Sequence, residues 1–138
     1  MSLEEIRSLR IEKLNKIKEK GINPFSSVFE KNLSISEAIF GFDALEKEEK
    51  NICLVGRIKA IRGHGGSLFL NIQDDSGILQ CYLKKDLVGE DVFSLFENTI
   101  DMGDFLGVCG TMFLTKKGEK TLLVSEYKIL TKSLLPLH

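Results

Sequence analysis

The sequence of 138 residues has few of the residues that metal sites and disulfide frameworks require. It contains no tryptophan, two prolines, two histidines and three cysteines. The cysteines form no Cys-x-x-Cys pair and have no histidine cluster near them, so the sequence predicts no metal site. Each lies in an apolar, strand-like run, and we interpret all three as unpaired core residues in a reducing compartment. They are Cys53, Cys81 and Cys109.

Charge and hydropathy exclude further classes of protein. No apolar run is long enough to span a membrane, and the charged N-terminus is unlike a secretory signal, so we expect a cytoplasmic protein without a membrane partner. The formal net charge is −1, which excludes a global electrostatic attraction to nucleic acid. Any binding of nucleic acid therefore has to be local. The length fits one domain with a terminal appendage.

The most regular part of the chain is a pair of alternating runs that flank the turn-forming cluster Asp75-Ser76-Gly77, which predicts a β-hairpin. A turn centred between Asp75 and Ser76 gives one apolar face and one mixed face. The apolar face pairs Leu68 with Leu83, Leu70 with Cys81 and Ile72 with Leu79. The mixed face pairs Phe69 with Tyr82, Asn71 with Gln80 and Gln73 with Ile78. Two rings beside three amides can stack on a flat base and hydrogen-bond its edge.

Two helices are predicted ahead of the hairpin, over 2–20 and 34–50. Each begins with a Ser-x-x-Glu capping box. The first helix carries more lysine and arginine than glutamate, and two interpretations of it stay open. It is either a solvated surface or a phosphate-contacting rod, in which Arg10 and Lys13 would contact RNA.

Further strands are predicted beyond these helices, over 52–62, 105–114 and 120–130, with a helix over 89–100. The glycine inside the first of them, Gly56, is typical of a bulge or a sharp bend. The order β-β-β-α-β-β after N-terminal helices predicts a mainly β protein, a five-stranded OB-fold barrel. Such barrels bind oligonucleotides on the face of strands two and three, which here is the mixed face of the hairpin. We expect an N-terminal helical extension (1–50), the barrel (51–131) and the start of a linker (132–138).

Several motifs along nearly the whole chain carry a family resemblance. They are Lys20-Gly21-Ile22-Asn23-Pro24-Phe25, Val55-Gly56-Arg57-Ile58, Gln73-Asp74, Gly77-Ile78-Leu79-Gln80, Tyr82-Leu83-Lys84-Lys85, Lys116-Lys117-Gly118-Glu119 and the exit from Leu130 to Leu137. In these motifs the sequence resembles the anticodon-binding region of the class II aminoacyl-tRNA synthetases for lysine, aspartate and asparagine. The resemblance is closest to the lysyl enzymes.

The resemblance implies a role for each matching position. Phe69 would stack on the middle anticodon base, a uridine, while Gln80 would hydrogen-bond the edge of that base with Arg62 beside it. Glu119 would contact a neighbouring anticodon base. Further candidate RNA contacts are Asn71, Tyr82, Arg10 and Lys13. The sequence departs from the lysyl pattern at Gly66, where a lysine is frequent, and so lacks one phosphate contact.

The resemblance also implies partners that this chain does not contain. They are a tRNA with a lysine-specific anticodon, a class II catalytic domain that uses ATP and Mg²⁺, and a second subunit in a homodimer of the full-length enzyme. We expect the chain alone to bind tRNA without catalysis and without a cofactor. Three alternatives stay open: an aspartyl- or asparaginyl-type domain, a general single-strand-binding OB module, and a role confined to supporting a dimer interface.

Overall fold

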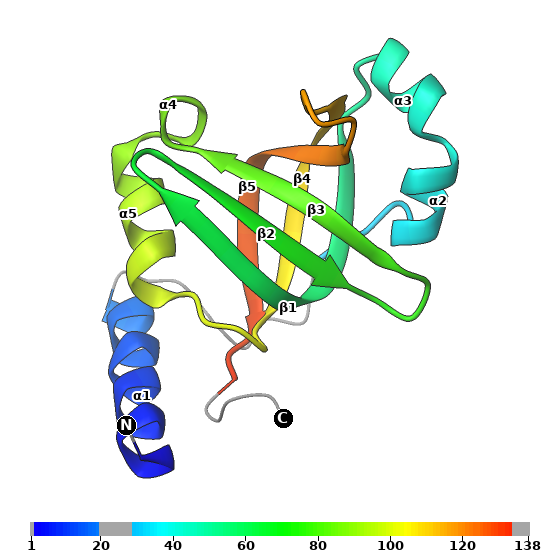
Figure 1. The fold of residues 1–138 in the computed structure, drawn as a ribbon. Helices are drawn as coiled ribbons and strands as arrows, with labels where there is room; N and C mark the ends of the chain where they lie inside the picture. Colours follow the sequence, from blue (N-terminus) through cyan, green and yellow to red (C-terminus); the bar gives the residue numbers. More distant parts are fainter. Residues whose placement is uncertain (1, 20–28, 134–138) are drawn as a thin grey trace.

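The computed structural model describes residues 2–19 and 29–133, which form a β-barrel with helices around it (Figure 1). The helices are α1 (Leu3–Glu19), α2 (Ile35–Phe40), α3 (Phe42–Lys47), α4 (Lys85–Val88) and α5 (Glu90–Thr99). The strands are β1 (Ile52–His64), β2 (Ser67–Gln73), β3 (Ile78–Lys84), β4 (Phe105–Leu114) and β5 (Lys120–Thr131). The predicted order of the strands and of the helix between the third and fourth strands is confirmed, with the short α4 as an addition. None of the helices in the described ranges is long and apolar enough to cross a membrane.

The five strands close into a barrel in the order β1-β2-β3-β5-β4. All neighbours are antiparallel except β3 and β5, which run parallel. Strand β1 pairs with β4 through its first half and with β2 through its second half, so it has to bend. A side chain at Gly56 would come within 3.1 Å of Ile72 and of the backbone of Gln73, which leaves little room for any residue but glycine. Further along β1, between Ile58 and Ala60, the register with β2 shifts.

The predicted register of the hairpin is confirmed in full. All six expected pairs are found, and the side chains of the predicted apolar face are all buried. The turn is held by Asp74, whose Oδ1 accepts hydrogen bonds from the backbone N–H groups of Ser76 (2.7 Å) and Gly77 (3.0 Å). Its Oδ2 accepts from the backbone N–H of Ile35 at 2.9 Å, which ties the hairpin to the start of α2. Burial acts to raise the pKa of Asp74, but a hydrogen bond from the Ser76 hydroxyl, together with these backbone hydrogen bonds, outweighs burial and holds the pKa below its usual value.

The single helix predicted over 34–50 is wrong, because the chain breaks at Gly41 into α2 and α3. The capping box of Ser34 and Glu37 at the start of α2 is present as predicted. Each of the two short helices buries two apolar residues in the core of the barrel, whereas Phe40 at the end of α2 is exposed. The buried residues are Ile35, Ala38, Phe42 and Leu45. The helical region before β1 therefore shares one hydrophobic core with the strands.

An ion cluster holds the end of β5 to the loop before β4. The ammonium group of Lys132, whose side chain is completely buried, lies 2.6 Å from Asp101 Oδ2 and 2.7 Å from Asp104 Oδ2. The backbone N–H of Ser133 donates to Asp104 Oδ1 at 2.8 Å. Lys132 and Ser133, where the sequence predicts the start of a linker, are thus fixed to the barrel.

Helix α1 joins the same cluster through two cations. Lys13 Nζ lies 2.6 Å from Asp101 Oδ1, and Arg10 Nε lies 3.8 Å from Asp101 Oδ2. Arg10 is only 8% exposed, so the interpretation of α1 as a wholly solvated surface is wrong at this residue. These contacts give Arg10 and Lys13 a structural role, and their predicted contact with RNA stays a prediction. Gly21, which follows the helix predicted over 2–20 and is the residue type typical of a C-cap, lies outside the described residues.

The prediction of three unpaired cysteines is wrong for two of them. Cys53 on β1 and Cys109 on β4 are directly opposite each other in the sheet and form a disulfide. Periodicity placed each cysteine in a strand, but only the pairing of β1 with β4 brings the two sulfur atoms together. Cys81 is free and buried as predicted, and burial raises the pKa of its thiol to about 12. The expected reducing, cytoplasmic setting stays a prediction.

Candidate nucleic-acid interface

Two rows of side chains cross the outer face of the barrel. The first row contains Arg62 on β1, Phe69 on β2 and Tyr82 on β3, which are neighbours in the strand register. The second row contains Asn71 on β2, Gln80 on β3 and Thr121 on β5. Strand alternation places both rows on the side opposite the buried leucines, as predicted for the mixed face of the hairpin.

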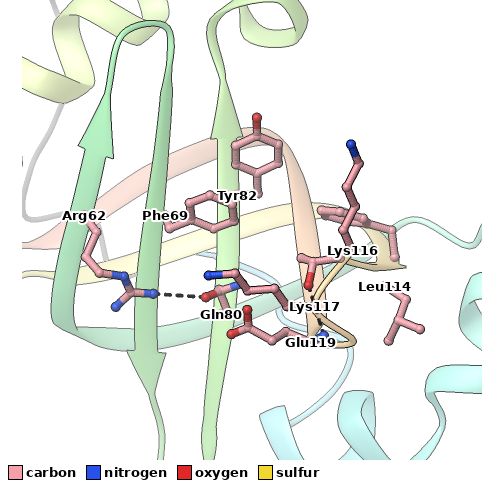
Figure 2. A pocket seen from close by; sticks show the side chains of 10 residues that line it. Arg62, Phe69, Gln80, Tyr82, Leu114, Lys116, Lys117 and Glu119 are labelled. Atoms are coloured by element: carbon pink, nitrogen blue, oxygen red, sulfur yellow. Dashed lines mark hydrogen bonds between the residues drawn. The ribbon is translucent and has the colours of Figure 1, made fainter.

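An open pocket of about 720 Å³ lies between these rows and the turn that joins β4 to β5 (Figure 2). Its lining residues are Arg62, Phe69, Gln80, Tyr82, Phe113, Leu114, Thr115, Lys116, Lys117 and Glu119. The turn is itself well ordered by hydrogen bonds between Thr115 and Glu119, and Gly118 adopts the positive φ of 85° that the tight turn needs. The pocket thus has a rigid strand floor and a basic turn as its rim.

Three aromatic rings form one wall of the pocket. The rings of Phe69 and Tyr82 are stacked, with centroids 4.5 Å apart and planes inclined by 11°. Tyr82 also contacts Phe113 at a centroid distance of 6.1 Å. In Figure 2, the Arg62–Gln80 hydrogen bond lies on the other side of the Phe69 ring from Tyr82. Since Tyr82 covers one face of Phe69, the opposite face is the one on which a flat base can stack.

Polar groups with defined directions lie below this ring. Arg62 Nη2 donates a hydrogen bond of 3.0 Å to Gln80 Oε1. Gln80 Nε2 donates a hydrogen bond of the same length to Thr121 Oγ1. Oε1 and Nε2 can each make two hydrogen bonds, and each makes one here. Oε1 therefore keeps a lone pair, and Nε2 keeps an N–H, for a ligand.

The pocket is locally basic although the chain as a whole is not. Arg62, Lys116 and Lys117 line it together with a single carboxylate, that of Glu119. Within the described part of the chain, none of these three cations forms an ion pair. Their charge is therefore free to meet an anionic ligand, in agreement with the expectation that any attraction to nucleic acid is local.

The structure brings together most of the residues predicted from the sequence. Arg62, Phe69, Gln80, Tyr82 and Glu119 all line the pocket. Asn71 lies opposite Gln80 on the same face but is outside the pocket lining. Arg10 and Lys13 lie on α1, at the end of the barrel away from the β4–β5 turn (Figure 1).

Several functional candidates were missed by sequence reasoning. They are Phe113, Leu114, Thr115, Lys116, Lys117 and Thr121. A signal for the lysines was present, because the connection between strands four and five of an OB-fold is a usual site of oligonucleotide contact. No local signal marked Thr121, which reaches Gln80 only through the parallel pairing of β3 with β5.

The closed five-stranded barrel and the aromatic, basic pocket on β2 and β3 define the class of OB-fold nucleic-acid-binding domains. Comparison with known families agrees, since the family tRNA_anti-codon, described as an OB-fold nucleic acid binding domain, matches residues 52–130. The chain belongs to this family of anticodon-binding domains.

Similar proteins are found among lysine–tRNA ligases. The chain is 40% identical over 139 residues to the enzyme of Thermosipho africanus and 42% identical over 135 residues to that of Carboxydothermus hydrogenoformans. It is 40% identical over 142 residues to the enzyme of Shouchella clausii. These alignments cover 98%, 98% and 99% of this chain but only 28%, 27% and 28% of the relatives. The chain spans little more than a quarter of their length and is homologous to their N-terminal region.

Proposed function

We propose that this chain binds tRNA through the pocket on β2 and β3 and reads the anticodon for a lysine–tRNA ligase. The observation that carries the proposal is the meeting of an aromatic ring (Phe69), a directed carboxamide (Gln80) and a basic turn in one pocket. The similarity to lysine–tRNA ligases supports lysine as the amino acid of the parent enzyme.

Each part of the pocket matches a part of an anticodon nucleotide. The Phe69 ring stacks on the middle base, a uridine, and the Gln80 carboxamide bonds the hydrogen-bonding edge of that base. Arg62 contributes charge beside it, and Lys116 and Lys117 contact backbone phosphates from the rim. Glu119, also on the rim, contacts a flanking anticodon base.

The proposal divides recognition from catalysis. This chain supplies binding and positioning of the tRNA, while a class II catalytic region of the same polypeptide, using ATP and Mg²⁺, attaches lysine. A homodimer is the form in which we expect the full-length ligase to act. None of these partners is needed for the pocket to bind an isolated anticodon stem-loop.

Replacing Phe69 by alanine tests the proposal directly. Stacking of one base on an aromatic side chain is worth about 1–3 kcal/mol, so F69A should weaken binding of an anticodon stem-loop with a UUU anticodon by about fivefold or more. The measurement is a fluorescence anisotropy titration with labelled stem-loops. The matched control is F40A, because Phe40 is 96% exposed on α2 and outside the pocket.

The outcomes separate the open alternatives. Equal affinities of F69A, F40A and the unchanged protein would contradict the proposal. Equal affinity of the unchanged protein for unrelated single strands would favour a general single-strand-binding module. Stem-loops with the anticodons of lysine, aspartate and asparagine share the middle uridine, so a preference among them reports how the flanking bases are read.

A further inference from the structure

The two ends of the Gln80 carboxamide are held by different partners. Arg62, which is exposed on β1, donates to Oε1, while Thr121, which is completely buried on β5, accepts from Nε2. Gln80 and Thr121 are direct neighbours in the parallel register of β3 and β5. The closure of the barrel therefore places a hydroxyl group beneath the side chain that faces the pocket.

The direction of the Thr121 hydroxyl is determined by a third group. Its Oγ1 lies 3.2 Å from the backbone carbonyl oxygen of Glu119, an atom that can only accept a hydrogen bond. A hydroxyl group has one proton, so donation to this carbonyl leaves its lone pairs to face Gln80. Thr121 consequently accepts a hydrogen bond from Gln80 and presents no donor to it.

Both neighbours therefore enforce the same orientation of the carboxamide. A guanidinium group can only donate, so Arg62 requires Oε1 on its side. Thr121 requires Nε2 on the other side, and a rotation of the carboxamide by 180° would break both hydrogen bonds. The pocket thus presents one acceptor and one donor in a fixed order.

The order of acceptor and donor matters because uracil and cytosine have different orders of donor and acceptor on their hydrogen-bonding edges. Uracil offers an N–H donor at N3 beside a carbonyl oxygen, whereas cytosine offers an acceptor at N3 beside an amino donor. A carboxamide held in one orientation can hydrogen-bond the donor and acceptor of one of these bases. It can bond those of the other base only after a rotation by 180°. A freely rotating carboxamide would accept either base.

We infer that Thr121 is a positioning residue that fixes the Gln80 carboxamide and so increases discrimination of uridine from cytidine at the middle anticodon position. This inference rests on the proposed function and adds a residue on β5 to the recognition of the base. Thr121 does not line the pocket and acts through Gln80.

The test compares binding of two anticodon stem-loops that differ only in a middle uridine or cytidine. T121V keeps the shape of the side chain and removes the hydroxyl, so the ratio of the two affinities should fall about fivefold, the usual net value of one hydrogen bond. T121S keeps the hydroxyl, so its ratio of the two affinities should equal that of the unchanged protein. T99V is the matched control, because Thr99 is also completely buried and its hydroxyl bonds only to Leu95 within α5.

A second readout follows the carboxamide without RNA. The side-chain NH₂ resonances of Gln80 in ¹⁵N-labelled protein should shift in T121V and stay in place in T99V. Thermal melts establish which variants are folded, and T121A replaces T121V if the valine is not accommodated. An unchanged uridine-to-cytidine ratio in the folded hydroxyl-free variant, with F69A still weakening both stem-loops, would overturn the inference and leave the proposed function intact. Failure of the unchanged protein to prefer the uridine loop would instead overturn both.

Discussion

The pocket on β2 and β3 and the ion cluster beside α1 both gather polar side chains, yet they differ in how completely these are partnered. In the ion cluster, the completely buried Lys132 has a carboxylate oxygen within 2.7 Å on each of two aspartates. In the pocket, Arg62, Lys116 and Lys117 are exposed and line an open space of about 720 Å³. Buried Lys132 is thus held by ion pairs inside the fold, whereas the cations of the pocket are exposed where a ligand can reach them.

The same difference explains why basic residues on α1 and in the pocket have different roles. Arg10 and Lys13 both form ion pairs with Asp101, so their charge contributes to docking of α1 onto the barrel. Lys116 and Lys117 extend from a turn that is held by hydrogen bonds between Thr115 and Gly118 or Glu119. Composition alone could not separate these two pairs, because both occur in locally basic stretches.

The largest effect on stability should come from the disulfide. It belongs to neither the pocket nor the ion cluster, and its removal tests whether both depend on closure of the barrel. Cys53 and Cys109 are 56 residues apart, and the chain-entropy model gives about 4 kcal/mol for a closed loop of this size. Reduction should lower the free energy of unfolding by about this amount, measured by urea denaturation with and without dithiothreitol. The double variant C53A/C109A should show no response to the reductant. Identical denaturation curves for the unchanged protein in both conditions would show that the disulfide contributes nothing.

The next effect concerns the ion cluster alone. D104A removes one carboxylate from the completely buried Lys132 and deprives Ser133 of its hydrogen-bond acceptor, so we expect a loss of about 3 kcal/mol in unfolding free energy. Urea denaturation measures the loss, with D86A on the exposed α4 as the control. The affinity of folded D104A for the UUU stem-loop should be unchanged. A variant that keeps its stability but loses affinity would reverse the division of roles between the two groups.

The smallest effect concerns the rim of the pocket. K117A removes a cation that lines the pocket without an intramolecular ion pair, so stability should stay within about 0.5 kcal/mol while affinity for the stem-loop falls severalfold. The slope of log K against log salt should also become shallower by about 0.7, the value for one phosphate contact on a single strand. K50A, on the exposed surface after α3, is the control. Equal salt slopes for K117A and K50A would exclude a phosphate contact by Lys117.

The hairpin shows how much of the structure a local sequence pattern can predict. Alternation of apolar and polar residues and the turn cluster around Ser76 were sufficient to predict six of the seven pairs between β2 and β3. Phe69 and Gln80 could be placed on one face because that face follows from the register. The break at Gly41 was not predicted, because Phe42 leaves the helical path to pack in a core formed by strands later in the chain.

Pairings between distant segments explain the errors that matter for function. Cys53 meets Cys109 because β1 pairs with β4, and Thr121 meets Gln80 because β3 pairs with β5. Neither pairing has a turn between its strands that the sequence could reveal. The ion pairs of Lys132 were likewise not predicted, because its carboxylate partners, Asp101 and Asp104, lie about thirty residues earlier in the chain.

The sequence by itself determined the order of the strands along the chain, the outward face of the hairpin and the two side chains on which the proposed recognition depends. These follow from interactions between residues close in sequence, where side-chain period and turn chemistry leave one consistent register. Only the tertiary structure decided which groups complete that face and which are neutralised inside the molecule. Closure of the barrel placed the Thr121 hydroxyl under Gln80 and the basic turn opposite Phe69, since a closed sheet joins strands that local sequence patterns cannot relate.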